Sequence, residues 1–228
     1  MSVYVTGDTH GDIDWSKLNT THFPEQKDLT EDDLVIIAGD FGGVWDGANQ
    51  DRYIQNWYDD KPFTTAFVDG NHENHWLLNS YQTMRWNGGK VHRISQKLVH
   101  LMRGEVYTIQ GKKFFVIGGA DSVDKAWRKY GVSWWPEEQP NDKEFKNALK
   151  NLNRHNFKVD YVITHDCSTK ILETMYKETW PVQLNHFLDS LEYEHDLEFD
   201  HWYFGHHHID KEIDDKHTAL YKKIVKVI

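Results

Sequence analysis

Histidine and aspartate are the residues whose number and spacing suggest chemistry in this chain of 228 residues, which carries 15 histidines and one cysteine, Cys167. Several histidines stand beside aspartate or asparagine in short segments. These are Gly7-Asp8-Thr9-His10, Gly39-Asp40, Gly70-Asn71-His72-Glu73, His165-Asp166 and Gly205-His206-His207-His208. Carboxylate, amide and imidazole groups without a thiolate cluster are typical of sites for Mn, Fe, Zn or a similar divalent ion.

The candidate ligands are too many for one tetrahedral ion. They are Asp8, His10, Asp40, Asn71, His165, His206 and His208. Seven ligands suit two ions that share a bridging carboxylate. Two ions about 3.5–4 Å apart can clamp a phosphate and lower the pKa of a bridging water, so that the resulting hydroxide attacks phosphorus. The ions would also let a chain of net charge −10 accept an anionic substrate, because local charge governs a site.

Each polar segment directly follows a short apolar run that predicts a buried strand. The runs are Val3–Thr6, Leu34–Ala38, Thr65–Val68, Tyr161–Thr164 and Trp202–Phe204, and Lys113–Ile117 is a sixth predicted strand. In open α/β sheets, ligands bind beyond the carboxyl ends of the strands. We therefore expect the five polar segments to converge on one cleft.

Apolar residues at helical spacing predict three helices between these strands, at Gln50–Tyr58, Lys143–Leu152 and Val182–Leu191. Asn141 and Pro181 are suitable helix-start residues. Strands that alternate with helices indicate an α/β domain.

Two regions, Lys97–Gly118 and Ile209–Ile228, instead predict adjacent strands and hence a mixed sheet or a second sheet. The tryptophan-rich stretch Ala120–Pro140 predicts a long ordered loop with one short helix. We expect Trp134 and Trp135 to pack there, and the stacking of a nucleobase is the alternative.

Composition excludes several classes of protein. The chain has 26 Lys+Arg against 36 Asp+Glu, which argues against a basic surface for duplex nucleic acid. One cysteine excludes an intramolecular disulfide. The first residues lack a signal-peptide pattern and no apolar run is long enough to span a membrane, so we expect a cytoplasmic protein. Without a linker or repeat, residues 1–228 are expected to form a single domain of undetermined oligomeric state.

In this order, the five segments resemble the calcineurin-like metallophosphoesterase superfamily, whose pattern is DxH, GDxx, GNH[ED], a lone H after a strand, and GHxH. The resemblance extends from Asp8 to His208, and the blocks Gly118–Ser122 and Trp134–Glu138 look like small bacterial and phage members. It implies a two-sheet β-sandwich flanked by helices, a four-layer αββα arrangement. It also implies a metal-dependent phosphoric ester hydrolase, for which manganese is one candidate ion.

The same resemblance implies a role for each site residue. One ion would be held by Asp8, His10, Asp40 and His208, and the other by Asp40, Asn71, His165 and His206, with Asp40 bridging. Asp40 and His72 would be catalytic. His72, which is not a ligand in this assignment, would contact the phosphate and protonate the leaving oxygen, a role that suits histidine near neutral pH.

One departure from the family concerns the second motif. In the Ser/Thr protein phosphatase branch this motif continues as GDxVDRG with a phosphate-gripping arginine, whereas this chain reads Gly39-Asp40-Phe41-Gly42-Gly43. Arg52, Arg85 or Arg128 could take its place. The sequence does not choose between them, and Arg128 is named as the candidate substrate-binding residue.

The substrate stays open between phosphate monoesters and diesters, including a nucleotide or single-stranded nucleic acid, with a small phosphorylated substrate or nucleotide as the expected partner. A non-catalytic interaction module on the same fold is the alternative. The complete ligand set disfavours it, because function resides in the site rather than in the fold.

Residues next to the candidate ligands receive secondary expectations. Asp12 and Glu73 either orient ligands or are solvated. His207 is expected to point away from its neighbours, because side chains alternate along an extended segment. His75 is expected on the surface of a helix, and Cys167 in the core rather than as a nucleophile.

Overall fold

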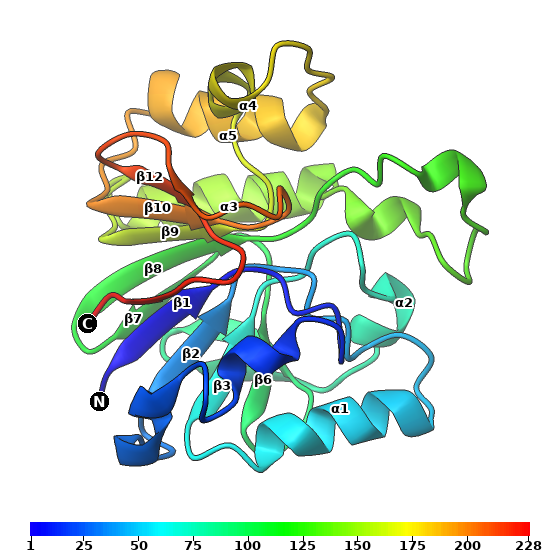
Figure 1. Cartoon of the computed structure of the whole chain (residues 1–228). Coiled ribbons are helices and arrows are strands. Elements are labelled where there is room, and N and C mark those ends of the chain that lie inside the picture. Colours follow the sequence, from blue (N-terminus) through cyan, green and yellow to red (C-terminus); the bar gives the residue numbers. More distant parts are fainter.

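Two β-sheets packed face to face form the centre of the computed structural model, which describes residues 1–228 (Figure 1). The 7-stranded sheet has the order β13-β1-β2-β3-β6-β5-β4, and the 6-stranded sheet has the order β11-β12-β10-β9-β8-β7. The strands of the first sheet are β1 Val3–Thr6, β2 Leu34–Ile37, β3 Thr64–Phe67, β4 Thr83–Trp86, β5 Gly89–Arg93, β6 Leu98–Leu101 and β13 Ile224–Lys226. Those of the second are β7 Glu105–Ile109, β8 Lys112–Ile117, β9 Tyr161–Thr164, β10 His201–Phe204, β11 Lys211–Glu212 and β12 His217–Ala219.

The five strands that precede the polar segments are adjacent and parallel within their sheets. β2 lies between β1 and β3, with Ile37 opposite both Thr6 and Phe67. β9 pairs with β10, with Thr164 opposite Phe204. All six strands predicted from apolar runs are confirmed to within a residue at each end. Their carboxyl ends therefore meet at one edge of the two sheets.

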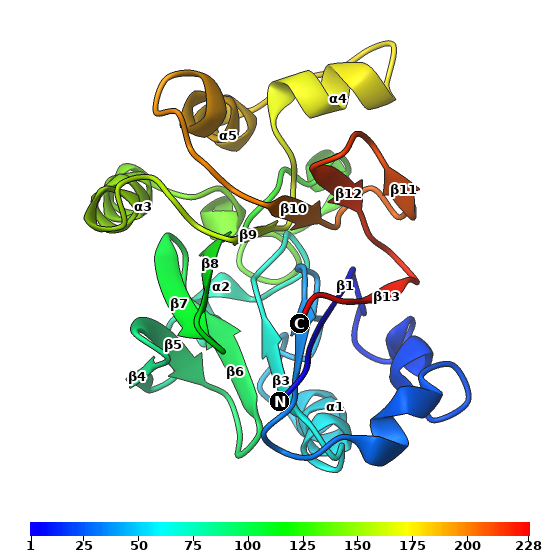
Figure 2. The ribbon, with the colours of Figure 1, turned by 90° about the vertical axis from the view of Figure 1, so that its left-hand side faces the viewer.

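Three apolar clusters separate four layers, seen end-on in Figure 2. The middle cluster lies between the sheets and includes Val5, Phe114 and Ile163. The outer clusters bury Tyr58 of α1 against the first sheet and Leu188 of α5 against the second. The helices are α1 Asn49–Asp59, α2 His75–Leu78, α3 Asp142–Arg154, α4 Thr169–Met175 and α5 Gln183–Tyr193. The four-layer αββα prediction is confirmed.

The predicted helices form where amphipathic spacing indicated them. The start of α3 has a full capping box, in which the Asn141 side chain accepts from the backbone of Glu144 and the Glu144 side chain accepts from the backbone of Asn141. Pro181 lies just outside α5, which is preceded by Val182 as its cap residue. None of the helices is long and apolar enough to cross a membrane.

Two features of the β-structure differ from the expectation. Lys97–Gly118 holds three strands, but β6 belongs to the first sheet while β7 and β8 belong to the second. The β4–β5 hairpin was not predicted. Its turn is Asn87-Gly88, with φ values of 47° and 92°, a dipeptide that strongly favours two-residue hairpin turns.

The tryptophan-rich stretch is a long excursion at the carboxyl-end edge of the sheets, drawn in green at the right of Figure 1. It contains two 3-10 turns, Lys125–Trp127 and Pro136–Glu138, rather than one helix. Trp135 is buried, as expected, with its ring 5.2 Å from that of Trp45. We refer to residues 121–140 as the excursion.

Candidate metal centre

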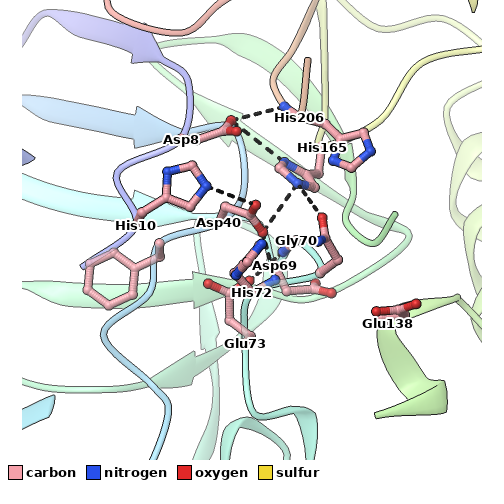
Figure 3. A network of polar contacts seen from close by, with 12 residues as sticks. Asp8, His10, Asp40, Asp69, Gly70, His72, Glu73, Glu138, His165 and His206 are labelled. Atoms are coloured by element: carbon pink, nitrogen blue, oxygen red, sulfur yellow. Dashed lines mark hydrogen bonds and ion pairs between the residues drawn. The ribbon is translucent and has the colours of Figure 1, made fainter. Parts of the chain in front are cut away.

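Asp40, at the end of β2, lies between two groups of potential ligands (Figure 3). Its Oδ2 is 3.3 Å from Nε2 of His10, and its Oδ1 is 3.3 Å from Nε2 of His165. The carboxylate is 1% exposed. Its two oxygens thus face opposite sides, which is the arrangement of a bridging ligand.

Asp8, His10 and His208 make up the first group. Oδ2 of Asp8 is 3.1 Å from Nε2 of His208, and the rings of His10 and His208 are 4.8 Å apart. The other oxygen of Asp8 accepts from the backbone N–H of His206 at 3.0 Å. Oδ2 is fully buried and its contact with His208 lacks hydrogen-bond geometry, so it has no hydrogen-bond donor. A buried carboxylate oxygen of this kind suits a cation.

The second group contains Asn71, His165 and His206. His165 places Nδ1 2.8 Å from the Ala38 carbonyl, so its Nε2 faces the site, 3.3 Å from Oδ1 of Asn71. The amide nitrogen of Asn71 donates to Oγ of Ser122 at 3.2 Å, which leaves Oδ1 directed at the site. Ligand atoms of Asp40, His165 and His206 lie within 4.8 Å of one another. All seven candidate ligands are therefore brought together.

The backbone of the site adopts unusual conformations. His10, Asp40, His206 and His208 have φ values between 44° and 64°. Gly39 has φ +95°, and a Cβ there would lie 2.1 Å from Nδ1 of His165. Left-handed conformations of non-glycine residues store strain and cluster at functional sites. The glycine before Asp40 is needed because the His165 ring packs against it.

Two buried carboxylates dominate the electrostatics. Burial alone would raise the pKa of Asp40, but the charge of His165 and the hydrogen bond with His10 hold it well below its usual value. In turn, although burial opposes it, the charge of Asp40 raises the pKa of His165 to about 10 and that of His10 to about 9. The carboxylates thus draw positive charge into the site, and together with the orphaned oxygen of Asp8 they fit divalent cations.

His72 is not a ligand in the assignment above, but it lies beside both groups, and ligand atoms of His10, Asp40 and His72 lie within 4.8 Å of one another. Its backbone N–H donates to Oδ1 of Asp40 at 2.8 Å, and its ring is 5.3 Å from that of His10. Nε2 of His72 is 3.0 Å from Nη2 of Arg128, which reaches the site from the excursion. Burial lowers the pKa of His72, and the positive charge of Arg128 lowers it further.

A chain of contacts that the sequence did not indicate orients the first group. Oδ2 of Asp14 is 2.9 Å from Nδ1 of His10, and the Tyr221 hydroxyl donates to Oδ1 of Asp14 at 2.9 Å. The Tyr221 ring also stacks on His208, with centroids 4.8 Å apart and planes inclined by 15°. Hydrogen bonds to the second nitrogen of a ligating histidine fix its tautomer and orientation.

Lys17 lies beneath the first group and is 7% exposed. Its Nζ donates to the carbonyls of Gly7, Asp8 and Tyr221 at 2.7, 2.6 and 2.5 Å. Each of the three ammonium protons is therefore donated to a main-chain carbonyl. The lysine ties the loop after β1 to the segment that leads into β13.

Glu73 joins the second and third polar loops. It is fully buried and accepts from the backbone N–H groups of Gly42 at 2.9 Å and Gly70 at 2.5 Å. Burial raises the pKa of its carboxyl to about 8. Asp12 is exposed and contacts Gln50, which agrees with a solvated carboxylate rather than with one that orients a ligand. Only Glu73 supports the site.

Asp69 anchors the third loop from behind and was not predicted. It is 1% exposed and accepts from Nε of Arg103 at 2.8 Å, with Nε2 of His100 3.0 Å away. His75 belongs to this cluster, 3.8 Å from Asp69 and 3% exposed, so its predicted surface position is wrong. α2 is a single turn, which offers no periodicity from which its buried face could be inferred.

Two neighbours of the ligands lie where expected. His207 turns away from the ligand groups and places Nε2 3.1 Å from Oδ1 of Asp166 and Nδ1 3.2 Å from the Tyr176 hydroxyl. Cys167 is buried in the apolar cluster under α3 and α5, and burial raises the pKa of its thiol well above the usual value. A thiol in that state is a poor nucleophile.

The fold and the site together define a layered α/β protein with a candidate metal centre of carboxylates and imidazoles at the carboxyl ends of its strands. A profile of the calcineurin-like phosphoesterase family matches residues 1–210. The chain therefore belongs to this family.

Solved structures that the chain matches include the phosphopantetheinyl hydrolase PptH of Mycobacterium tuberculosis (14% identity, TM-score 0.48, 96% of this chain and 89% of that one). Another is the sulfate thiohydrolase SoxB of Thermus thermophilus in complex with glycerol (10% identity, TM-score 0.44, 97% of this chain and 51% of that one). No curated protein matches the sequence.

Proposed function

We propose that this protein is a dinuclear metal-dependent phosphoesterase. The observation that carries the proposal is the position of Asp40, whose two oxygens lie 3.3 Å from His10 on one side and 3.3 Å from His165 on the other. Asp8 and His208 complete the first set of ligands. Asn71, His165 and His206 complete the second. Two divalent ions held there would supply the charge that binds a phosphate and would lower the pKa of a water between them.

The chain's own residues then have distinct tasks. Asp40 connects the two ligand sets. His72 stands beside them without being needed as a ligand in this assignment. Its Nε2 accepts from Arg128 in the structure, so once a bound phosphate takes over that donor, the protonated imidazole would give a proton to the oxygen that leaves phosphorus when the ester bond breaks. Glu73, Asp14 and Lys17 hold the loops and rings in place. A small phosphorylated compound or nucleotide is the proposed substrate.

Metal analysis and hydrolysis assays together test the proposal. Protein purified without chelator is expected to contain close to two divalent ions per chain, and to hydrolyse aryl phosphates when Mn or another divalent ion is supplied. His72→Ala should retain the ions but lose about 10²- to 10⁴-fold in turnover, the usual contribution of a general acid. His22→Ala, which changes an exposed histidine, is the matched control.

Two outcomes would contradict the proposal in different ways. Full activity of His72→Ala would remove the role of that imidazole. The absence of bound metal, together with no hydrolysis under any divalent ion, would favour the non-catalytic module.

A further inference from the structure

Arg128 is the arginine that the excursion delivers to the site. Its side chain is 11% exposed, and Nε donates to Oδ1 of Asp124 at 2.7 Å. Nη2 donates to Nε2 of His72 at 3.0 Å. The guanidinium is thus aimed by a carboxylate on its own segment and touches the histidine that would face the substrate.

The other two candidate arginines lie elsewhere. Arg52 is exposed on α1 and contacts Asn49, and Arg85 is exposed on β4 and contacts the carbonyl of Gly88. Neither has a contact with a ligand or with His72. The structure therefore decides a choice that the sequence left open.

The guanidinium of Arg128 has N–H groups that lack an acceptor. Nη1 is buried and has no hydrogen-bond partner. A buried donor without an acceptor costs about 1–3 kcal/mol, and for a charged group the cost is at the upper end. Two N–H groups in the plane of a guanidinium match two oxygens of a phosphate. Such an anion beside His72 would replace the imidazole as the acceptor of Nη2, and it would also satisfy Nη1 once the guanidinium turns to expose that buried nitrogen to the anion.

We propose that Arg128 is the phosphate-binding arginine of this enzyme and makes it selective for phosphate monoesters. A monoester presents three terminal oxygens and about two negative charges, whereas a diester presents two oxygens and one charge. If two terminal oxygens face the ligand groups, only a monoester has a third for Arg128. In a diester that position carries an esterified oxygen, a weak acceptor with a bulky substituent. The proposal rests on the proposed function and narrows its substrate class.

Kinetics on matched esters test this selectivity. The kcat/KM values for p-nitrophenyl phosphate and bis(p-nitrophenyl) phosphate are measured for the metal-loaded wild type and for Arg128→Met and Arg128→Lys. We expect Arg128→Met to lose about 30- to 100-fold on the monoester and less than about 3-fold on the diester, because only the first interaction is removed. Arg128→Lys keeps the positive charge but not the paired N–H groups of a guanidinium, so it should recover part of the kcat/KM lost on the monoester. Arg85→Met is the control.

Binding gives a second readout that does not depend on turnover. Inorganic phosphate, which has the terminal oxygens of a monoester, should raise the melting temperature of the metal-loaded wild type more than dimethyl phosphate does. Arg128→Met should abolish that difference while its metal content stays at the wild-type value, and its melting temperature without anion should not fall, because the substitution removes a buried unpaired donor.

The proposal would be overturned if Arg128→Met lost kcat/KM by the same factor on both esters. It would also be overturned if the variant changed neither the two kcat/KM values nor the effect of phosphate on the melting temperature. In both cases hydrolysis itself persists in the wild type, so these results are distinct from failure of the phosphoesterase function.

Discussion

Replacement of Lys17 by methionine probes the support beneath the first ligand group. Methionine keeps much of the length of the side chain but leaves the carbonyls of Gly7, Asp8 and Tyr221 without their donor. At about 1–3 kcal/mol for each unsatisfied buried acceptor, the loss is about 3–9 kcal/mol. Burial lowers the pKa of Lys17 from 10.5 to about 8. Removal of that buried charge returns about 3 kcal/mol at 1.36 kcal/mol per pKa unit.

The loss from the three carbonyls minus the return from the buried charge is a net destabilisation of about 0–6 kcal/mol, and the middle of this range is about 3 kcal/mol. For a chain of this length, a change of 1 kcal/mol shifts the melting temperature by about 2–4 °C, so we expect a decrease of about 6–12 °C. The assay is urea and thermal unfolding of metal-free protein. Lys146→Met, an exposed lysine on α3 without an ion pair, is the matched control.

The pH dependence supplies the sign of the electrostatic part. Between pH 8 and pH 10.5 the unfolded chain binds the Lys17 proton and the folded chain does not. Wild-type stability relative to Lys17→Met should therefore rise with pH across this window. A Lys17→Met protein within about 0.5 kcal/mol of the Lys146→Met control, which is about a twofold change in the unfolding constant, would refute the reasoning.

Three further predictions concern the buried charges around the site. Asp69→Asn should lower the free energy of unfolding by about 3–5 kcal/mol in urea titrations, because Arg103 loses its buried partner; a loss under 1 kcal/mol would contradict this. The pKa values of Asp69 and Asp166 are held below their usual range despite burial, by Arg103 and by a hydrogen bond from His207 respectively. Stability of metal-free protein should thus fall as pH drops below about 5, and a flat urea midpoint from pH 7 to pH 3.5 would argue against it. Asp14→Asn should weaken metal affinity by about 10- to 100-fold in chelator competition, and unchanged affinity would show that the orientation of His10 does not depend on Asp14.

The convergence of the seven candidate ligands could be predicted from the sequence because each of them follows closely on a strand. An apolar run such as Val3–Thr6 predicts a buried strand, and the residue after the run must then lie at the carboxyl end of that strand. The glycines before Asp8, Asp40, Asn71 and His206 added a local signal. The Asn87-Gly88 dipeptide is a comparable local signal, for a hairpin turn.

The supporting residues could not be predicted in this way. Lys17 donates to the carbonyl of Tyr221, and Asp69 accepts from Arg103, so both partners lie far away in the sequence. Nothing near Lys17 in the sequence distinguishes it from a solvated lysine. Similarly, the choice of Arg128 depends on the path of the excursion, which no periodicity describes.

The pairing of β13 with β1 has a consequence for how the centre assembles when the chain folds. Asp8 follows β1, and one of the two neighbours of β1 is β13. Tyr221, just before β13, contacts Asp14 and His208, and Tyr221 and Asp14 are 207 positions apart in the sequence. Contacts between distant parts of a chain form only after the entropy of closing the loop between them has been lost. We therefore expect the first ligand group to be among the last parts of the site to become ordered during folding.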